Sequence, residues 1–237
     1  RPMTQDQQAM LYGLGAVALW STVATAFKVA LAWMSPLELM WIAALVSWLL
    51  MGALVIKQGN MALALRQGWR TALWAGLMNP VAYYLVLFAA YDRLPGQEAM
   101  ALNYTWALAM AFLAVPLLGH RLTRLDVAAG LVACSGVWVI ATRGNVFNVA
   151  FEDPLGVLLA LSSTLLWALY WLLNAKDKRQ PLVGQWQNFS VGLPVLTMLL
   201  LLGPGVQWHG WPALGAGVYV GLFEMGVAFV LWQLAVQ

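Results

Sequence analysis

Eight long apolar segments divide this sequence, and each is long enough to cross a lipid bilayer as a helix. A helix needs about 20 predominantly apolar residues to span the hydrocarbon core. Strands of a membrane barrel would alternate in polarity over about ten residues, and these segments do not alternate. The sequence therefore predicts an all-α, polytopic helical membrane protein. The predicted spans lie near residues 10–32, 36–56, 69–91, 97–118, 124–142, 154–174, 183–203 and 211–233.

Composition supports the same class. The 237 residues are 62% apolar and only 9% charged, whereas a soluble domain has about 45–50% apolar and about 25% charged residues. The bias excludes a soluble globular domain and intrinsic disorder. The net charge of +3 is not gathered into a basic stretch with interleaved aromatic residues, so nucleic acid is not an expected partner. The expected surroundings are a lipid bilayer.

Orientation follows from the basic residues, because cytoplasmic loops of membrane proteins are enriched in Lys and Arg. With the N-terminus inside, nine of the twelve basic residues fall on the inner side and only Arg93 and Arg143 on the outer side. The predicted location is the inner (plasma) membrane, with a cytoplasmic N-terminus. The inner loop 57–68 contains a short apolar run that can lie as an interfacial helix.

Two predicted spans resemble each other. Residues 76–85 of span 3 align with residues 221–230 of span 8 at a constant offset of 145. The partner spans are five apart, and an odd number of spans per repeat makes the two copies inverted in the membrane. The prediction is an inverted repeat of five plus five transmembrane helices with eight present. Residues 1–145 form the first repeat and 146–237 an incomplete second one, with helices 6–8 here and two further helices expected after residue 237.

A family resemblance is densest in two motifs, E-A-M-A-L-N-Y-T-W at 98–106 and P-L-L-G-H-R-L-T at 116–123. With them the chain resembles the drug/metabolite transporter superfamily, EamA type, and within it the YddG-like exporters of aromatic amino acids. The resemblance implies a secondary transporter that exports amino acids, aromatic ones favoured, through a central cavity by alternating access. Members often have Glu where His120 stands, and Pro where Ala107 stands, so one expected helix break is removed here.

Glu224 is the sharpest signal from the residues themselves. It lies near the middle of span 8, where an ionised carboxylate is costly unless it meets water, a partner or a proton. The alternative is a protonated Glu with a structural role. Asn79, its repeat partner, precedes Pro80, and a proline inside a helix frees a carbonyl and bends the axis.

Polar residues also recur at helical spacing in spans 1 and 6. Ser21 begins one such stripe, and Ser163, Trp167 and Tyr170 follow another. Because lipid does not favour polar faces, we expect these stripes to point inward. Helix–helix hydrogen bonding is the alternative, which we favour for Ser and Thr, whereas a cavity wall is favoured for Trp and Tyr.

The candidate substrate site combines these groups. Trp and Tyr faces suit an aromatic ring, Glu224 or a ring face suits an ammonium, and Asn, Ser and Tyr donors with a broken helix end suit a carboxylate. The candidate residues are Trp20, Ser21, Asn79, Tyr83, Asn103, Tyr104, Trp106, Trp167, Tyr170 and Glu224.

Enzyme and metal motifs are absent from the sequence. It contains no H-E-x-x-H, no G-x-S-x-G and no G-x-x-x-x-G-K-[ST]. His120, His209 and Cys134 are too few and too dispersed for a metal site. We therefore expect no enzyme activity and no cofactor, and a small molecule as the partner. Two alternatives stay open, a non-transporting membrane scaffold or sensor, and an exporter of other small metabolites or drugs. The driving force is either the substrate gradient or a proton gradient.

Overall fold

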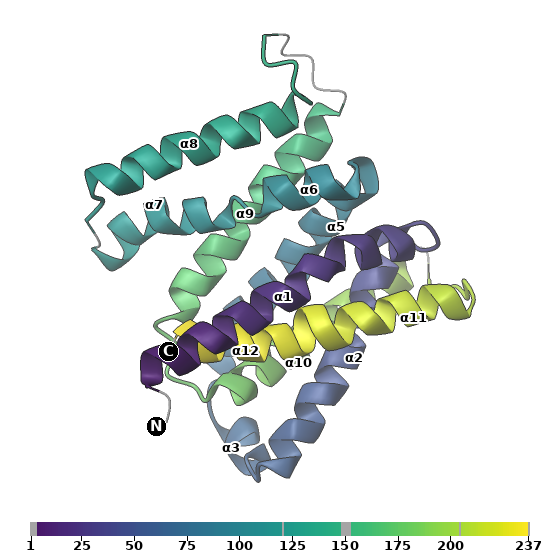
Figure 1. Cartoon of the computed structure of the whole chain (residues 1–237). Coiled ribbons are helices and arrows are strands. Elements are labelled where there is room, and N and C mark those ends of the chain that lie inside the picture. Colours follow the sequence, from purple (N-terminus) through teal and green to yellow (C-terminus); the bar gives the residue numbers. More distant parts are fainter. Residues whose placement is uncertain (1–3, 120, 148–152, 204, 237) are drawn as a thin grey trace. The chain divides into compact units, whose positions relative to one another are not determined.

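The structure is a computed structural model that describes residues 4–119, 121–147, 153–203 and 205–236. Throughout these ranges every regular element is a helix (Figure 1). The contacts divide the chain into two compact units. Unit 1 comprises Arg1–Val81 and Asp177–Gln237, and unit 2 comprises Ala82–Lys176.

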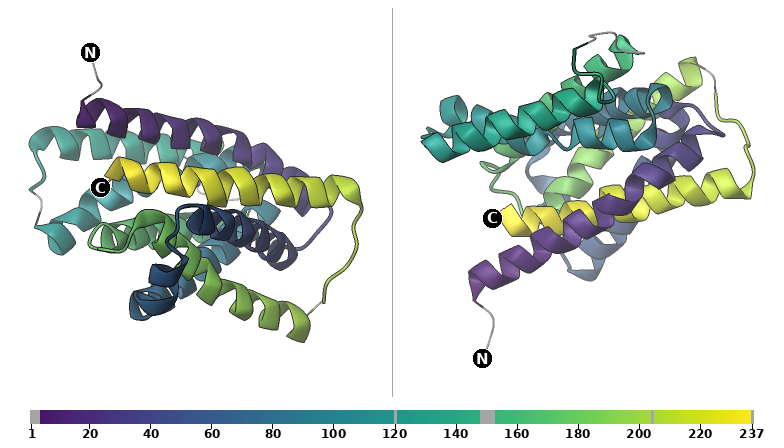
Figure 2. Two further views of the ribbon diagram at one scale, coloured as in Figure 1. Left: turned by 90° about the horizontal axis from the view of Figure 1, so that it is seen from below. Right: turned by 45° about the horizontal axis from the view of Figure 1, so that its top comes forward.

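Unit 1 is built around two helix pairs. In it, α1 packs along α12, α2 packs along α10 and against η2, and α4 packs on α10. Helix α12 lies against α1, as Figures 1 and 2 show. The elements are α1 (Gln5–Leu31), α2 (Pro36–Lys57), α3 (Met61–Arg66), α4 (Trp69–Gly76), the π-helical η1 (Leu77–Ala82, which ends at the boundary with unit 2), α10 (Pro181–Leu202), α11 (Trp211–Tyr219), the π-helical η2 (Val220–Val227) and α12 (Ala228–Val236).

Unit 2 is organised around α9, which contacts three of its four other helices. Helices α5, α6 and α7 pack on α9, and α8 packs on α6. The elements are α5 (Tyr83–Arg93), α6 (Gly96–Asn103), α7 (Trp106–Leu118), α8 (Arg124–Ala141) and α9 (Pro154–Asn174).

The predicted fold class is confirmed. Each predicted span corresponds to one helix or to consecutive helices, and six of these are long and apolar enough to cross a membrane. The other two predicted spans are α8, which has 18 residues, and α10, which has 22. Three amide side chains, Gln185, Gln187 and Asn188, make the first half of α10 unusually polar for a span. Helix α3 occupies the loop in which a short interfacial helix was expected.

Helix starts follow the local sequence. Ser35 caps α2 with its side chain and Glu38 returns a bond to the Ser35 backbone, a capping box that satisfies two N–H groups left unpaired at a helix start. Pro36 occupies the first turn, where its missing N–H costs nothing. Proline also occupies the first turn of α9, α10 and α11.

Spans 3 and 8 are interrupted at related positions. The π-helical η1 separates α4 from α5, and η2 separates α11 from α12. Asn79 within η1 leaves helical geometry altogether, with φ −143° and ψ 114°. Short π segments inside α-helices are rare and are often found at functional sites.

Gly76 and Gly221 each lie where two helices of unit 1 cross, and the two crossings involve corresponding residues. A Cβ on Gly76 would lie 2.4 Å from the Asn188 carbonyl oxygen and 3.0 Å from the Val191 Cβ. A Cβ on Gly221 would lie 2.6 Å from the Ala43 carbonyl oxygen and 2.7 Å from the Val46 Cβ. The sequence offset of 145 that relates the two glycines also relates both pairs of contacted residues. Only glycine allows backbones to approach this closely.

The two units do not coincide with the predicted repeats 1–145 and 146–237. Unit 1 draws on spans 1, 2, 7 and 8 and on the first part of span 3. The two divisions describe different things, because helices from both halves of an inverted repeat pack against each other. The repeat boundaries stay a prediction.

Candidate functional site

A chain of buried polar side chains links three helices of unit 2. The Tyr83 hydroxyl donates to Asn103 Oδ1 over a long 3.5 Å, and Asn103 Nδ2 donates to Ser163 Oγ at 2.9 Å. The Ser163 hydroxyl donates to the Ala160 carbonyl at 2.6 Å. Tyr83, Asn103 and Ser163 are all buried. Buried polar groups that are paired in this way fix one arrangement of α5, α6 and α9.

A row of aromatic rings packs on the Tyr83 end of this polar chain. The Trp167 ring centroid lies 4.4 Å from that of Tyr83 and 5.5 Å from that of Trp171. Tyr170 packs edge-on against Trp171 at 5.0 Å, and all four rings are buried. Such tilted and edge-to-face pairs are the favoured contacts of aromatic side chains. The structure therefore brings together four predicted site residues, Tyr83, Asn103, Trp167 and Tyr170.

Span 4 is broken next to Asn103. Helix α6 ends at Asn103, and α7 begins at Trp106 without a side-chain cap. The expectation that Ala107, in place of proline, removes a helix break is wrong. The Thr105 hydroxyl and the Thr105 N–H both donate to the Leu102 carbonyl, which closes α6 in a tight turn without proline. The start of α7 carries the positive end of a helix dipole at mid-span.

Unit 1 holds Trp20, Asn79 and Glu224, all of them buried. Trp20 Nε1 donates to the Glu224 backbone carbonyl at 3.4 Å, and its ring centroid lies 5.4 Å from that of Trp232. Trp20 is thus engaged in helix packing. The amide of Asn79 is 1% exposed, and within the described part of the chain neither its nitrogen nor its oxygen has a hydrogen-bond partner. A buried amide without partners is costly, which marks Asn79 as a candidate ligand group.

The remaining predicted residues differ in exposure. Ser21 is exposed on α1, and its hydroxyl donates to the Ala18 carbonyl at 2.7 Å. Tyr104 is half-buried in the break of span 4, whereas Trp106 is buried. Unit 1 contains four of the ten predicted residues and unit 2 contains six, so a single site formed by all ten stays a prediction.

Sequence reasoning missed the amide side chains of α10. Gln185 Nε2 donates to Gln233 Oε1 at 2.9 Å, while Gln187 and Asn188 accept hydrogen bonds from Arg179. All three α10 amides are at most 1% exposed. A signal was available, because Q-W-Q-N at 185–188 is a notably polar run for a predicted span.

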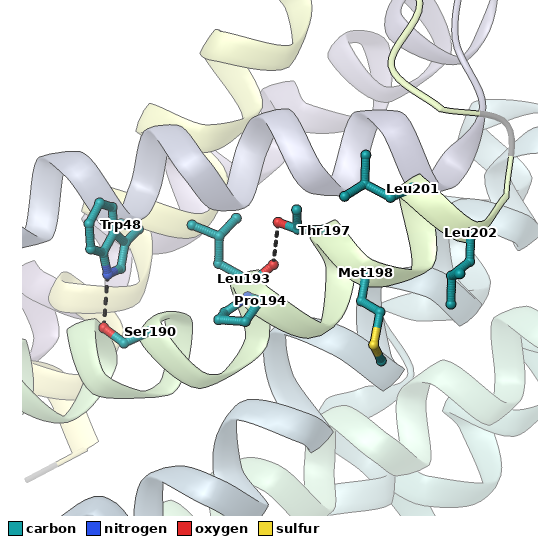
Figure 3. A pocket seen from close by; sticks show the side chains of 8 residues that line it. All are labelled: Trp48, Ser190, Leu193, Pro194, Thr197, Met198, Leu201 and Leu202. Atoms are coloured by element: carbon teal, nitrogen blue, oxygen red, sulfur yellow. Dashed lines mark hydrogen bonds between the residues drawn. The ribbon is translucent and has the colours of Figure 1, made fainter.

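A groove of about 590 Å³ runs along the second half of α10, which contains Pro194, beside Trp48 of α2 (Figure 3). Trp48 Nε1 donates to Ser190 Oγ at 2.8 Å, and Thr197 Oγ1 donates to the Leu193 carbonyl at 2.8 Å. The lining is largely apolar, and the polar side-chain atoms in it are thus already paired. A zwitterion that entered this groove would lose its hydration without gaining hydrogen bonds. The groove is therefore not our candidate substrate site.

Ion pairs lie at the helix ends. In unit 2, Arg93 pairs with Asp153 at 3.2 Å and Arg143 with Glu98 at 3.1 Å. The Gly156 N–H, which donates to the Asp153 carboxylate, and nearby Arg93 hold the pKa of Asp153 below its ordinary value. In unit 1, His209 Nε2 lies 3.0 Å from Glu38 Oε1.

No cluster of three or more His, Cys, Asp or Glu side chains suited to a metal ion occurs among the residues that the structure describes. His120 lies outside these residues.

Membrane-length helices, interrupted spans and buried polar groups within them are features of multi-pass membrane transporters. The sequence model of the EamA-like transporter family matches residues 7–142, more than half of the chain. The chain belongs to this family, whose members carry small molecules across membranes. A solved structure titled "Crystal structure of protein" is 25% identical, with a TM-score of 0.75 over 96% of this chain and 78% of that chain. No curated protein sequence matches.

Proposed function

We propose that this protein exports amino acids, aromatic ones favoured, by alternating access. The observation that carries the proposal is the cluster of Tyr83, Asn103 and Trp167 beside the break between α6 and α7. Its rings offer faces for a flat apolar side chain, which gains from stacking and from burial. The same region offers polar groups within a membrane span, where such groups are rare without a function.

The charged groups of the substrate need partners of their own. The uncapped N-terminus of α7 presents backbone N–H groups that suit a carboxylate. Glu224, which is buried in η2, is our candidate for the ammonium or for a proton. Asn79 offers a buried amide at the matching interruption in span 3. Either a proton gradient or the substrate gradient supplies the driving force.

An inverted repeat is the proposed framework for alternating access. The matched π segments and the matched glycine crossings of Gly76 and Gly221 support it. They relate spans 2 and 3 to spans 7 and 8. The excess of Lys and Arg on one side supports an inner-membrane location with a cytoplasmic N-terminus.

Flux into proteoliposomes tests the proposal most directly. We expect labelled phenylalanine, tyrosine and tryptophan to be transported and to compete with one another. Leucine lacks the ring and phenethylamine lacks the carboxylate, so both should compete weakly. If aromatic amino acids neither move nor compete while hydrophobic cations do, the alternative of a drug or metabolite exporter holds instead.

A further inference from the structure

Arg179 lies two residues before the start of α10 and is much less exposed than its sequence context suggests. The K-D-K-R run at 176–179 is typical of a solvated turn, yet the side chains of Arg179 and Asp177 are only 10% and 3% exposed. Arg179 Nε donates to Asp177 Oδ2 at 2.8 Å, and Nη2 donates to the same oxygen at 2.7 Å. The charge is thus paired at close range, as a buried charge must be.

The rest of the guanidinium holds two side chains of α10. Nη1 donates to Gln187 Oε1 at 3.0 Å, and Nη2 donates to Asn188 Oδ1 at 3.0 Å. Both amides are fully buried. Arginine has five N–H donors in a rigid fork, and this site uses all three of its nitrogens. The amide oxygens face the cation, which leaves the amide nitrogens for other partners.

Gln187 connects Arg179 to the segment between α3 and α4. Its Nε2 donates to the carbonyls of Ala64 and Gln67. Gly68, with φ +89°, follows directly, and a Cβ there would lie 2.6 Å from Arg179 Cδ. The chain between α3 and α4 is therefore packed tightly onto Arg179 and Gln187.

The next turns of α10 pack against the end of α4 and against η1. The Asn188 carbonyl oxygen fills the space beside Gly76, and a Cβ on Gly192 would lie 2.9 Å from Pro80 Cγ. Asn79 stands between these two contacts in the sequence. One face of α10 thus joins Arg179 to the interruption of span 3.

We propose that Arg179 is a positioning residue for transport. Through Gln187 and Asn188 it fixes the α3–α4 connection and α4 on α10, and so sets the geometry of η1 and Asn79. The inference rests on the proposed function, in which Asn79 contributes to the substrate path. We call Asp177, Arg179, Gln187 and Asn188 the α10 clasp.

Three variants and a control test the clasp. Arg179→Lys keeps the charge but lacks the fork, and Arg179→Gln removes the charge. The double variant Asp177→Asn with Arg179→Gln leaves no unpaired buried charge, so it should fold even where the single neutralisation does not. Lys178→Gln is the matched control, because Lys178 is the exposed neighbour with the same charge.

Hydrogen exchange and transport are measured on the same proteins. In Arg179→Lys and in the double variant, the amides of residues 61–67 and 77–82 should exchange faster, because the contacts that hold them are lost. The maximal rate of aromatic amino-acid transport should fall by roughly tenfold or more, since small misplacements of binding groups are costly. Lys178→Gln should match the wild type in both measurements.

Two outcomes would overturn the proposal. Unchanged exchange in residues 77–82 would show that the clasp does not reach η1. Faster exchange with an unchanged transport rate would show that its geometry does not matter for transport. If the wild-type protein transports no aromatic amino acid, the proposed function fails, while the exchange data still decide whether Arg179 orders η1.

Discussion

Gly76→Ala and Gly221→Ala test whether the two matched crossings are true close contacts. An added Cβ would lie 2.4 Å from the Asn188 carbonyl oxygen in the first variant and 2.6 Å from the Ala43 carbonyl oxygen in the second. An ordinary contact between carbon and oxygen is about 3.3–3.6 Å. Because backbone atoms are in the way, α10 or α2 must move by roughly 1 Å. Overpacking of this kind costs about 1–3 kcal/mol.

Gly215→Ala is the matched control, because nothing lies within 4 Å of a Cβ at Gly215 in α11. Alanine is favoured over glycine in a helix by up to about 1 kcal/mol, so this variant should be neutral or slightly more stable. Both crossing variants should unfold below the control by roughly 2–12 °C, at about 2–4 °C per kcal/mol for a chain of this size.

The assay is the apparent melting temperature in detergent at one fixed scan rate, since unfolding of membrane proteins is often irreversible. Val46→Ala added to Gly221→Ala should recover only a small part of the loss, because it removes the Val46 Cγ1 at 3.0 Å but keeps the Val46 Cβ at 2.7 Å and the Ala43 carbonyl oxygen at 2.6 Å. Melting temperatures equal to that of Gly215→Ala would refute the close contacts and remove the main support for the repeat.

Three further predictions concern the site and the ion pairs. Tyr83→Ala and Trp106→Ala should each weaken competition by aromatic substrates by about 30-fold, or about 2 kcal/mol; wild-type affinity in both well-folded variants would place the ring site elsewhere. Glu224→Gln should abolish transport or its pH dependence, because it removes ionisation but keeps the shape; a wild-type pH profile would leave Glu224 as packing only. For Asp153, the lowered pKa means that its charged form stabilises the fold above about pH 4 and that this contribution is lost as pH falls through the folded-state pKa. Asp153→Asn should therefore melt below the wild type at pH 7 but alongside it near pH 2, and an equal gap at both pH values would contradict the assignment.

The spans were predictable because residues close to each helix end determine where the helix begins. Pro36, Pro154 and Pro181 each begin a helix close to where the apolar run begins. The interruption at Asn79 was also visible from the proline that follows it. The break after Asn103 was not, because it depends on a hydroxyl of Thr105 turning back to the Leu102 carbonyl rather than on a residue type that disfavours helices.

Helical spacing identifies a shared face but not which face is buried. Trp167 and Tyr170 lie on the buried side of α9, as their spacing and size suggested. Ser21 belongs to a regular stripe as well, yet the buried face of α1 is the adjacent one, which includes Trp20, Val23 and Phe27. The larger side chains of that face bury more apolar area, which decides how the helix packs. The burial of Arg179 could not be predicted from helical spacing at all. It depends on hydrogen-bond partners up to nine residues away, such as Asn188.

The two related crossings are not equally constrained. At one, the Ser47 hydroxyl donates to the Gly221 carbonyl at 2.6 Å and ties α2 to η2. At the other, the residue related to Ser47 by the same offset is Gly192, which has no side chain to donate and instead lies against Pro80. A hydroxyl bond to a backbone carbonyl resists sliding of the two helices in a way that an apolar contact does not. Span 8 is therefore held at its interruption by a direct bond, whereas span 3 depends on the fit of Gly76, Pro80 and Gly192 and on the ordering of α10 by the clasp.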